Sequence, residues 1–263
     1  PLDLIQPGSA NAADDAAMIA KLLSAGVESA KDPFWDNHAR TIITGMLVDL
    51  AHENLACRER TLGDTRALLA LAGADLSTLG LRFGTSPHPE VQAASASLST
   101  EFRVLSSIMA TAQSHMCFLR GGPVQESVAT STIPLNAITD GAPLTLYLVL
   151  PPDKLVSHGR LLRLWLGVVL SLFSRRKVIP PKPTLLLVDE AAQLGHLEPL
   201  LTAITLLRGY GVKVWSFWQD LAQIKTLYPN NWATLLNNCQ VQQFFAPASP
   251  HAAAEIEEYL AGS

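Results

Sequence analysis

The sequence predicts an α/β protein with a largely helical first half and a parallel β-sheet in its second half. Apolar residues recur at helical spacing up to about residue 130. Beyond that point, short and wholly apolar runs alternate with helical segments, which is typical of a parallel sheet covered on both faces. The 263 residues are 48% hydrophobic, enough to bury a large core. We therefore expect a globular protein, either one large α/β domain or a domain that carries an insertion.

Two helices are predicted near the start of the chain. Asn11 and Asp14 resemble a helix N-cap followed by an acidic first turn, and an apolar face follows. Asp32-Pro33 repeats this start signal, with proline at the first helical position. Apolar residues then continue at helical spacing as far as Leu50. We expect this second helix to be long and buried.

The helical pattern continues through residues 55–130. Thr61 and Asp64 resemble a capping box, with Asp in place of the usual Glu. Between residues 89 and 119, apolar side chains recur at every third or fourth position. This region is therefore predicted to be largely helical.

Four apolar runs predict β-strands in the second half, at residues 144–150, 184–188, 212–218 and 241–245. The first of these runs, LTLYLVL, is closed by two prolines, and a helix from about 154 to 173 follows it. Continuous apolar strands separated by helices indicate parallel pairing with both faces covered.

Composition argues against several other classes of protein. The longest strongly apolar run, residues 161–173, contains Arg163 and is shorter than the roughly 18 residues that span a bilayer. The chain opens without Met or a basic leader, so we expect it to begin within a longer protein. Its three cysteines lie far apart, which favours neither a disulfide framework nor a zinc site. A net charge of −4 argues against coating nucleic acid over the whole surface but leaves room for a local basic channel.

One tight basic cluster is present, Arg175-Arg176-Lys177, just after the helix predicted at about 154–173. A solvated helix end is the expected role of such a cluster. A contact with DNA phosphates is the alternative interpretation.

Two adjacent carboxylates, Asp189 and Glu190, directly follow the apolar run 184–188. The carboxyl ends of parallel strands converge where ligands bind. An apolar strand that ends in Asp-Glu is typical of the Walker B element, in which the Asp anchors Mg²⁺ and the next acid positions the attacking water. A strand-end Asp that caps the next helix gives the same pattern, and that alternative stays open. The glycine-rich P-loop that such sites require is absent from the sequence.

Six segments occur in a fixed order along the chain. They are PLDLI (1–5), DPFW (32–35), YLVLPPDKL (147–155), LLRL (161–164), LVDEAAQLG (187–195) and QDLAQI (219–224). In this order they resemble the type IV secretion coupling proteins, the ATPases of conjugative DNA transfer. The resemblance runs over essentially the whole chain and rests on the ordered set, because each segment alone is a weak signal.

The resemblance implies a RecA-like parallel-sheet nucleotide-binding domain with an inserted all-α domain. Residues 55–130 would form the all-α domain, between nucleotide-binding segments 1–54 and 131–263. In this family the P-loop precedes the segment that opens the chain, so its absence is interpreted as truncation. The resemblance also implies ATP and Mg²⁺ as cofactors, a homo-hexamer, and a location at the cytoplasmic face of the bacterial inner membrane, with a transmembrane anchor upstream.

The same resemblance assigns roles to four residues. Asp189 matches the magnesium ligand, acting through water, and Glu190 matches the catalytic acid/base. Gln219 matches a glutamine that senses the γ-phosphate, and Arg208 matches an arginine finger that reaches the neighbouring subunit's nucleotide. By residue type alone, Gln219 is equally a capping or solvent-facing amide and Arg208 a helix-end residue that meets the dipole. Gln219 is followed by Asp220 where Ser is more usual, which leaves the tuning of the sensor open.

The expected function is therefore an ATP-driven motor. It would recruit a relaxase-bound single DNA strand with its relaxosome proteins, or secreted effector proteins, and pass them to the type IV secretion channel proteins. One alternative is an ATP-independent recruitment platform built on residues 55–130, and another is a related hexameric DNA pump, which the helical insertion disfavours. Without a P-loop, the 263 residues alone are not expected to hydrolyse ATP efficiently.

Overall fold

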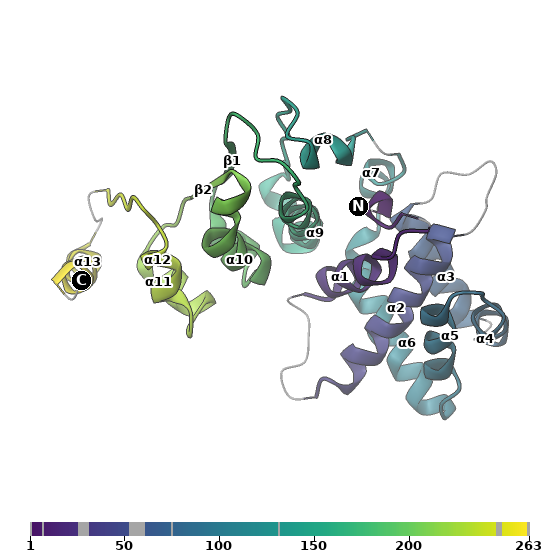
Figure 1. Cartoon of the computed structure of the whole chain (residues 1–263). Coiled ribbons are helices and arrows are strands. Elements are labelled where there is room, and N and C mark those ends of the chain that lie inside the picture. Colours follow the sequence, from purple (N-terminus) through teal and green to yellow (C-terminus); the bar gives the residue numbers. More distant parts are fainter. Residues whose placement is uncertain are drawn as a thin grey trace. The chain divides into compact units, whose positions relative to one another are not determined.

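In this computed structural model the described residues are 2–6, 8–25, 32–52, 61–74, 76–130, 132–245 and 249–261 (Figure 1). They form two compact units. We call Pro1–Asn136 together with Leu146–Val168 the helical unit, and Ala137–Thr145 together with Val169–Ser263 the sheet unit. Helices on both sides of residue 55 thus belong to the same unit, and the division into segments 1–54, 55–130 and 131–263 stays a prediction.

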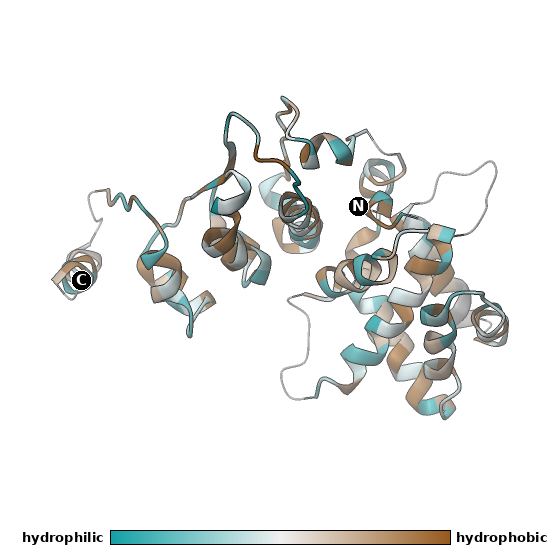
Figure 2. Cartoon of the chain, in the orientation of Figure 1, coloured by the Kyte–Doolittle hydropathy of each residue, from teal (hydrophilic) through white to brown (hydrophobic). Residues whose placement is uncertain are grey.

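The helical unit is built around one long helix, α2, which packs against α1, α5 and α6. The side chains of Ile42, Ile43, Met46 and Leu47 on α2 are fully buried, as predicted for this helix. Figure 2 shows brown apolar and teal hydrophilic residues on the same helices, as expected when only one face of a helix is buried. The elements are η1 (Leu2–Leu4), α1 (Ala12–Ser24), α2 (Phe34–His52), α3 (Leu62–Ala74), α4 (Leu76–Gly84), α5 (Pro89–Leu98), α6 (Phe102–Met116), η2 (Cys117–Leu119), α7 (Gly122–Ser127) and η3 (Pro152–Lys154).

Local capping signals explain where these helices begin. The N–H of Phe34 donates to Asp32 Oδ1 (3.1 Å), which confirms the predicted start of α2. Thr61 and Asp64 form the predicted capping box ahead of α3: Thr61 N–H donates to Asp64 Oδ2 (3.0 Å), and Asp64 N–H donates to Thr61 Oγ1 (3.1 Å). Asn11 stands at the N-cap of α1, but its side chain makes no capping hydrogen bond.

The apolar periodicity between residues 89 and 119 predicts a largely helical region, which the structure confirms and divides into two helices. Helix α5 ends at Leu98, and α6 starts at Phe102. Ser99 and Thr100 lie at the break, and the N–H of Ser99 already bonds the carbonyl of Ala96 rather than continuing the α-helical pattern. Ser and Thr compete for backbone groups and so favour helix ends, which the spacing of apolar residues does not reveal.

The sheet unit contains a pair of parallel strands, β1 (Thr184–Val188) and β2 (Val212–Ser216). Their register runs from Thr184 opposite Val212 to Val188 opposite Ser216. The crossover between them is made by η4 (Ala191–Leu194), α10 (Glu198–Leu206) and η5 (Leu207–Tyr210), and α11 (Leu221–Leu227), α12 (Trp232–Asn237) and α13 (Pro250–Ala261) follow β2. The predicted parallel strands are confirmed for residues 184–188 and for the first five residues of the predicted run 212–218.

The two other predicted strands do not form. Residues 144–150 and 241–245 carry no strand assignment, and neither has a ladder partner among the described residues. Tyr147 is 80% exposed and Val241 is 82% exposed. A β-prone run becomes a strand only when a neighbouring backbone takes up its N–H and C=O groups, and local sequence does not encode the presence of that neighbour.

Helix α9 (Leu155–Ser174) supplies residues to both units, and α8 (Leu135–Thr139) precedes it. In the described part of the chain, the helix from Pro152 to Ser174 is long and apolar enough to cross a membrane by length and composition, a test that buried core helices also pass. The first half of α9 is held inside the helical unit. There Arg160 Nη1 donates to the carbonyl of His115 (3.0 Å), and its guanidinium lies 4.8 Å from the Phe118 ring centre.

Candidate functional site

The candidate site lies where β1 and β2 end. Asp189 and Glu190 follow the last residue of β1, and two backbone hydrogen bonds hold this turn against the end of β2. Phe217 N–H donates to the carbonyl of Val188 (3.0 Å), and Ala191 N–H donates to the carbonyl of Phe217 (2.9 Å). Both carboxylate side chains are exposed. Within the described part of the chain they make no hydrogen bond or ion pair, so both remain able to bind a ligand.

Glu190 has an uncommon backbone conformation. Its φ of 47° and ψ of 55° are left-handed, and no other described residue except glycine has a positive φ. A side chain in this region costs on the order of 1–2 kcal/mol, because Cβ approaches the following carbonyl. Strain of this kind gathers at functional sites and persists only where the surrounding structure holds it. Here Val188 and Ala191 are both bonded to the backbone of Phe217, and η4 begins at Ala191. Only a tight turn through Glu190 can join them.

Gln219 lies at the same edge, three residues beyond the end of β2. Its N–H donates to Gln223 Oε1 (3.0 Å), and Gln223 Nε2 donates to Gln219 Oε1 (3.2 Å), so the two amides pair across the first turn of α11. Asp220 is the N-cap of α11, since its Oδ1 accepts from the N–H of Gln223 (2.7 Å). Ser is an equally good N-cap, so the departure at position 220 keeps the local structure.

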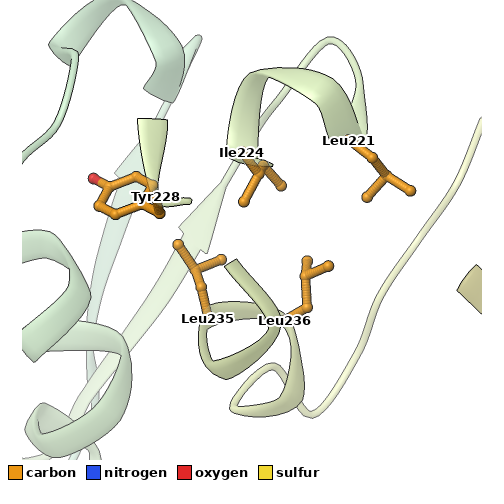
Figure 3. Close-up of a cluster of buried hydrophobic side chains, with 5 residues drawn as sticks. All are labelled: Leu221, Ile224, Tyr228, Leu235 and Leu236. Atoms are coloured by element: carbon orange, nitrogen blue, oxygen red, sulfur yellow. The ribbon is translucent and has the colours of Figure 1, made fainter. Parts of the chain in front are cut away.

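A hydrophobic cluster anchors this edge of the sheet unit. Leu221 and Ile224 of α11 and Leu235 and Leu236 of α12 point toward one another, beside Tyr228 (Figure 3). Trp218, the residue before Gln219, packs against the cluster, and its indole N–H donates to Ser216 Oγ (3.0 Å). The Tyr228 hydroxyl accepts from the N–H of Leu197 (3.2 Å). The cluster and the Tyr228 hydrogen bond thus connect α11, which follows β2, to Leu197, which precedes α10.

Arg208 lies at the opposite edge. It belongs to η5, which precedes β2, and the first residue of β2 pairs with the first residue of β1. A strand of five residues is about 16 Å long, so the length of β2 separates Arg208 from the edge with Asp189 and Glu190. With its amide oxygen turned toward Arg208, Gln240 accepts from Nη1 (3.0 Å) and Nη2 (3.2 Å). Arg208 is exposed and makes no ion pair with any described residue.

Arg176 departs from its predicted role as part of a solvated helix end. Its side chain is 8% exposed and lies inside the sheet unit, whereas its neighbour Lys177 is exposed. Nothing in the sequence distinguishes these two adjacent basic residues. The expectation holds for Lys177 and is wrong for Arg176, because the chain turns after α9 and directs the Arg176 side chain toward two backbone carbonyls and the Thr184 hydroxyl.

The carboxylates fit a hard divalent cation. Oxygen ligands from one or two carboxylates, completed by water and phosphate, are the usual protein environment of Mg²⁺. Asp189 offers such an oxygen at the strand end. In the residues that the structure describes, no group of three or more His, Cys, Asp or Glu side chains could form a metal cage made of protein alone. The arrangement therefore suits a metal that arrives with a phosphate ligand, rather than a permanent structural metal.

Comparison with known proteins gives consistent matches. The family described as type IV secretory system conjugative DNA transfer matches residues 1–262. Two Escherichia coli proteins, each called conjugal transfer protein TraG, are 25% identical over 270 residues and 24% identical over 280 residues. These matches cover 94% and 98% of the chain but 42% and 44% of the relatives, so the chain spans less than half of their length.

Solved structures of the plasmid coupling protein TrwB have the same fold. The TrwB complex with ADP and Mg²⁺ matches with a TM-score of 0.63 and 17% identity, over 86% of this chain and 51% of that one. The TrwB complex with the non-hydrolysable ATP analogue ADPNP matches with a TM-score of 0.61 and 18% identity, over the same shares of the two chains.

Proposed function

The chain belongs to the type IV secretory system family of conjugative DNA transfer proteins, and we propose that it is part of an ATP-driven coupling protein that delivers DNA to a secretion channel. The observation that carries this proposal is the gathering of Asp189, Glu190 and Gln219 at one edge of a parallel strand pair. That edge is where nucleotides bind in open parallel sheets.

Each residue at this edge has a distinct proposed role. Asp189 holds Mg²⁺ through a water molecule, and Glu190 orients and deprotonates the water that attacks the γ-phosphate. The metal, when bound, neutralises the charge that develops on the phosphate oxygens. Gln219 senses the γ-phosphate. Its pairing with Gln223 supports this role, because a change at Gln219 is passed directly to the first turn of α11.

Arg208 is proposed to act on the nucleotide of a neighbouring subunit in a homo-hexamer. The separation of about 16 Å from the Asp189 edge of its own chain supports action between subunits. Its neutral partner Gln240 leaves the guanidinium charge uncompensated, as a group that stabilises phosphate charge requires. The 263 residues alone have no P-loop to bind the phosphates, so turnover is proposed only for a form of the protein that carries one.

The partners follow from membership of the family. We propose relaxase-bound single-stranded DNA with relaxosome proteins, or secreted effector proteins, as the cargo, and the type IV secretion channel proteins as the recipient. The proposed location is the cytoplasmic face of the bacterial inner membrane. ATP-independent recruitment through residues 55–130 is the alternative.

Substitution of Glu190 by Gln tests the proposal in a form of the protein that carries a P-loop. We expect kcat for ATP to fall about 100-fold or more with KM nearly unchanged, because a general base acts in the transition state. Conjugative transfer should be lost in parallel. The matched control is Glu198→Gln, which removes an exposed carboxylate from the first turn of α10 in the same unit and should retain full turnover.

Two outcomes separate the candidate functions. Unchanged ATP turnover and transfer in Glu190→Gln would refute the proposed role of the site. Lost turnover with full transfer would instead favour the recruitment platform, in which ATP is secondary.

A further inference from the structure

Arg176 is a buried cation that the proposed site does not use. It follows α9 and is 8% exposed, and the residues that the structure describes offer it no ion pair. Burying a charge is costly unless its polar groups are satisfied. Burial lowers the pKa of Arg176, but a guanidinium stays protonated at physiological pH. A charge kept in such a place calls for a structural or functional reason.

This guanidinium donates three hydrogen bonds, and each reaches a different segment of the sheet unit. Nε donates to the carbonyl of Ile138 in α8 (3.0 Å), Nη1 to the carbonyl of Tyr210 in η5 (3.3 Å), and Nη2 to Thr184 Oγ1 in β1 (2.8 Å). The guanidinium carbon also lies 4.6 Å from the centre of the Phe173 ring. The planar fork of an arginine can hold three acceptors in fixed directions, which the single ammonium of a lysine does not reproduce.

One of these three contacts reaches η5, the element that carries Arg208, and a second reaches Thr184, which is bonded to the residue that follows η5. Tyr210 and Arg208 both belong to η5, a four-residue 3-10 turn. The turn closes with Gly211 N–H donating to the carbonyl of Arg208 (3.2 Å), and Thr184 N–H donates to the carbonyl of Gly211 (2.9 Å). The backbone N–H of Thr184 therefore bonds the residue that ends the turn. The Thr184 hydroxyl accepts from the same guanidinium that donates to the carbonyl of Tyr210.

We propose that Arg176 is a positioning residue that fixes η5 against the start of β1 and so aims Arg208 out of the sheet unit. This inference rests on the proposed function, in which Arg208 acts on a neighbouring subunit's nucleotide. A displacement of about 1 Å in a group that stabilises the transition state is enough to lower the rate about 100-fold. Loss of the Arg176 contacts should therefore reduce kcat and leave ATP binding in place.

The test uses kinetics of two variants in a form of the protein that carries a P-loop. Arg176→Lys keeps the charge but loses the fork, and Thr184→Val removes one acceptor with little change of shape. We expect kcat for ATP to fall about tenfold or more in Arg176→Lys and less in Thr184→Val, with KM unchanged in both. In an Arg208→Ala background neither substitution should lower kcat further, because both act through Arg208.

A second readout does not depend on turnover. Hydrogen exchange at the Gly211 amide reports the bond that closes η5. We expect faster exchange there in Arg176→Lys and in Thr184→Val. The matched control is Lys177→Met, which removes the neighbouring exposed charge and should change neither exchange nor kcat. If Arg176→Lys does not fold, Thr184→Val alone carries both measurements.

Several results would overturn the inference. One is unchanged hydrogen exchange at Gly211 in both variants. Another is a loss of kcat that adds to the loss in Arg208→Ala. A third is a loss of kcat in Lys177→Met equal to that in Arg176→Lys, which would indicate a DNA phosphate contact. Turnover that depends on Arg208 but not on Arg176 would remove this inference and leave the proposed function standing. Absence of turnover in the unsubstituted protein would remove both.

Discussion

At the scale of single residues, the left-handed backbone of Glu190 places a cost in stability at the residue proposed as the catalytic base. The conformation suits glycine, yet the chain keeps a carboxylate there at a cost on the order of 1–2 kcal/mol. A residue that is strained where chemistry is proposed is expected to be selected for its side chain rather than for its contribution to folding.

This strain predicts a difference between two inactive variants. Glu190→Ala keeps a Cβ in the left-handed region, whereas Glu190→Gly removes it. We expect Glu190→Gly to be more stable than Glu190→Ala by about 1 kcal/mol, seen as a Tm higher by about 2–4 °C in thermal unfolding of this chain. Equal Tm values would show that residue 190 does not adopt this conformation in solution.

The residues of the candidate site, and Arg176 outside it, differ in how far the sequence predicts them. Asp189 and Glu190 stand out in the sequence because a wholly apolar run ends at them, whereas Gln219 is singled out only by the family resemblance. Arg176 could not be found, because whether a basic residue is buried depends on backbone carbonyls that are distant in sequence, here those of Ile138 and Tyr210. No local pattern of residue types records such acceptors.

At the scale of elements, the packing of α2 against α5 depends on Gly45. A Cβ added to Gly45 would lie 2.5 Å from Ala94 Cβ, closer than two such atoms come. Both helices lie in the helical unit, and Ala94 is fully buried. The two backbones therefore approach at a point where only a glycine on one side fits.

Gly45→Ala is accordingly expected to destabilise the protein. Overpacking costs about 1–3 kcal/mol, which exceeds the gain of roughly 1 kcal/mol in helix propensity. Gly80→Ala in α4 is the matched control, because no atom lies within 4 Å of an added Cβ there, and it should stabilise by about 0.5–1 kcal/mol. Urea unfolding of the two variants measures both values. A stabilising Gly45→Ala would contradict the close approach, and recovery in Gly45→Ala/Ala94→Gly would support it.

The elements also show why some predictions from sequence succeed. Helix starts were predictable where the signal is local, as at Asp32 and at Thr61 with Asp64. Strands depend on partners, so residues 184–188 became a strand beside β2, while the equally apolar residues 144–150 did not become one. Apolar composition predicts that a segment is buried. It does not predict which strand the segment pairs with, because that partner depends on the whole fold.

At the scale of the whole molecule, the two edges of the strand pair bear on the proposed assembly into a ring. Asp189, Glu190 and Gln219 lie at one edge and Arg208 at the other, separated by about 16 Å along β2. If all four residues serve one nucleotide, two copies of the chain must contribute to each site. A ring with head-to-tail interfaces meets this requirement, because each subunit presents both edges to different neighbours.

Mixing two inactive variants tests this arrangement in a form of the protein that carries a P-loop. Glu190→Gln subunits keep a working Arg208, and Arg208→Ala subunits keep a working Glu190. In mixed rings, some interfaces pair the intact Glu190 of one subunit with the intact Arg208 of the next, so ATP turnover should reappear on mixing and peak near equal amounts. If Arg208 acts only within its own chain, no mixed interface is complete, and the mixture should stay as inactive as its components. The baseline is the double variant Glu190→Gln/Arg208→Ala, measured without either single variant. None of its interfaces contains an intact Glu190 or an intact Arg208.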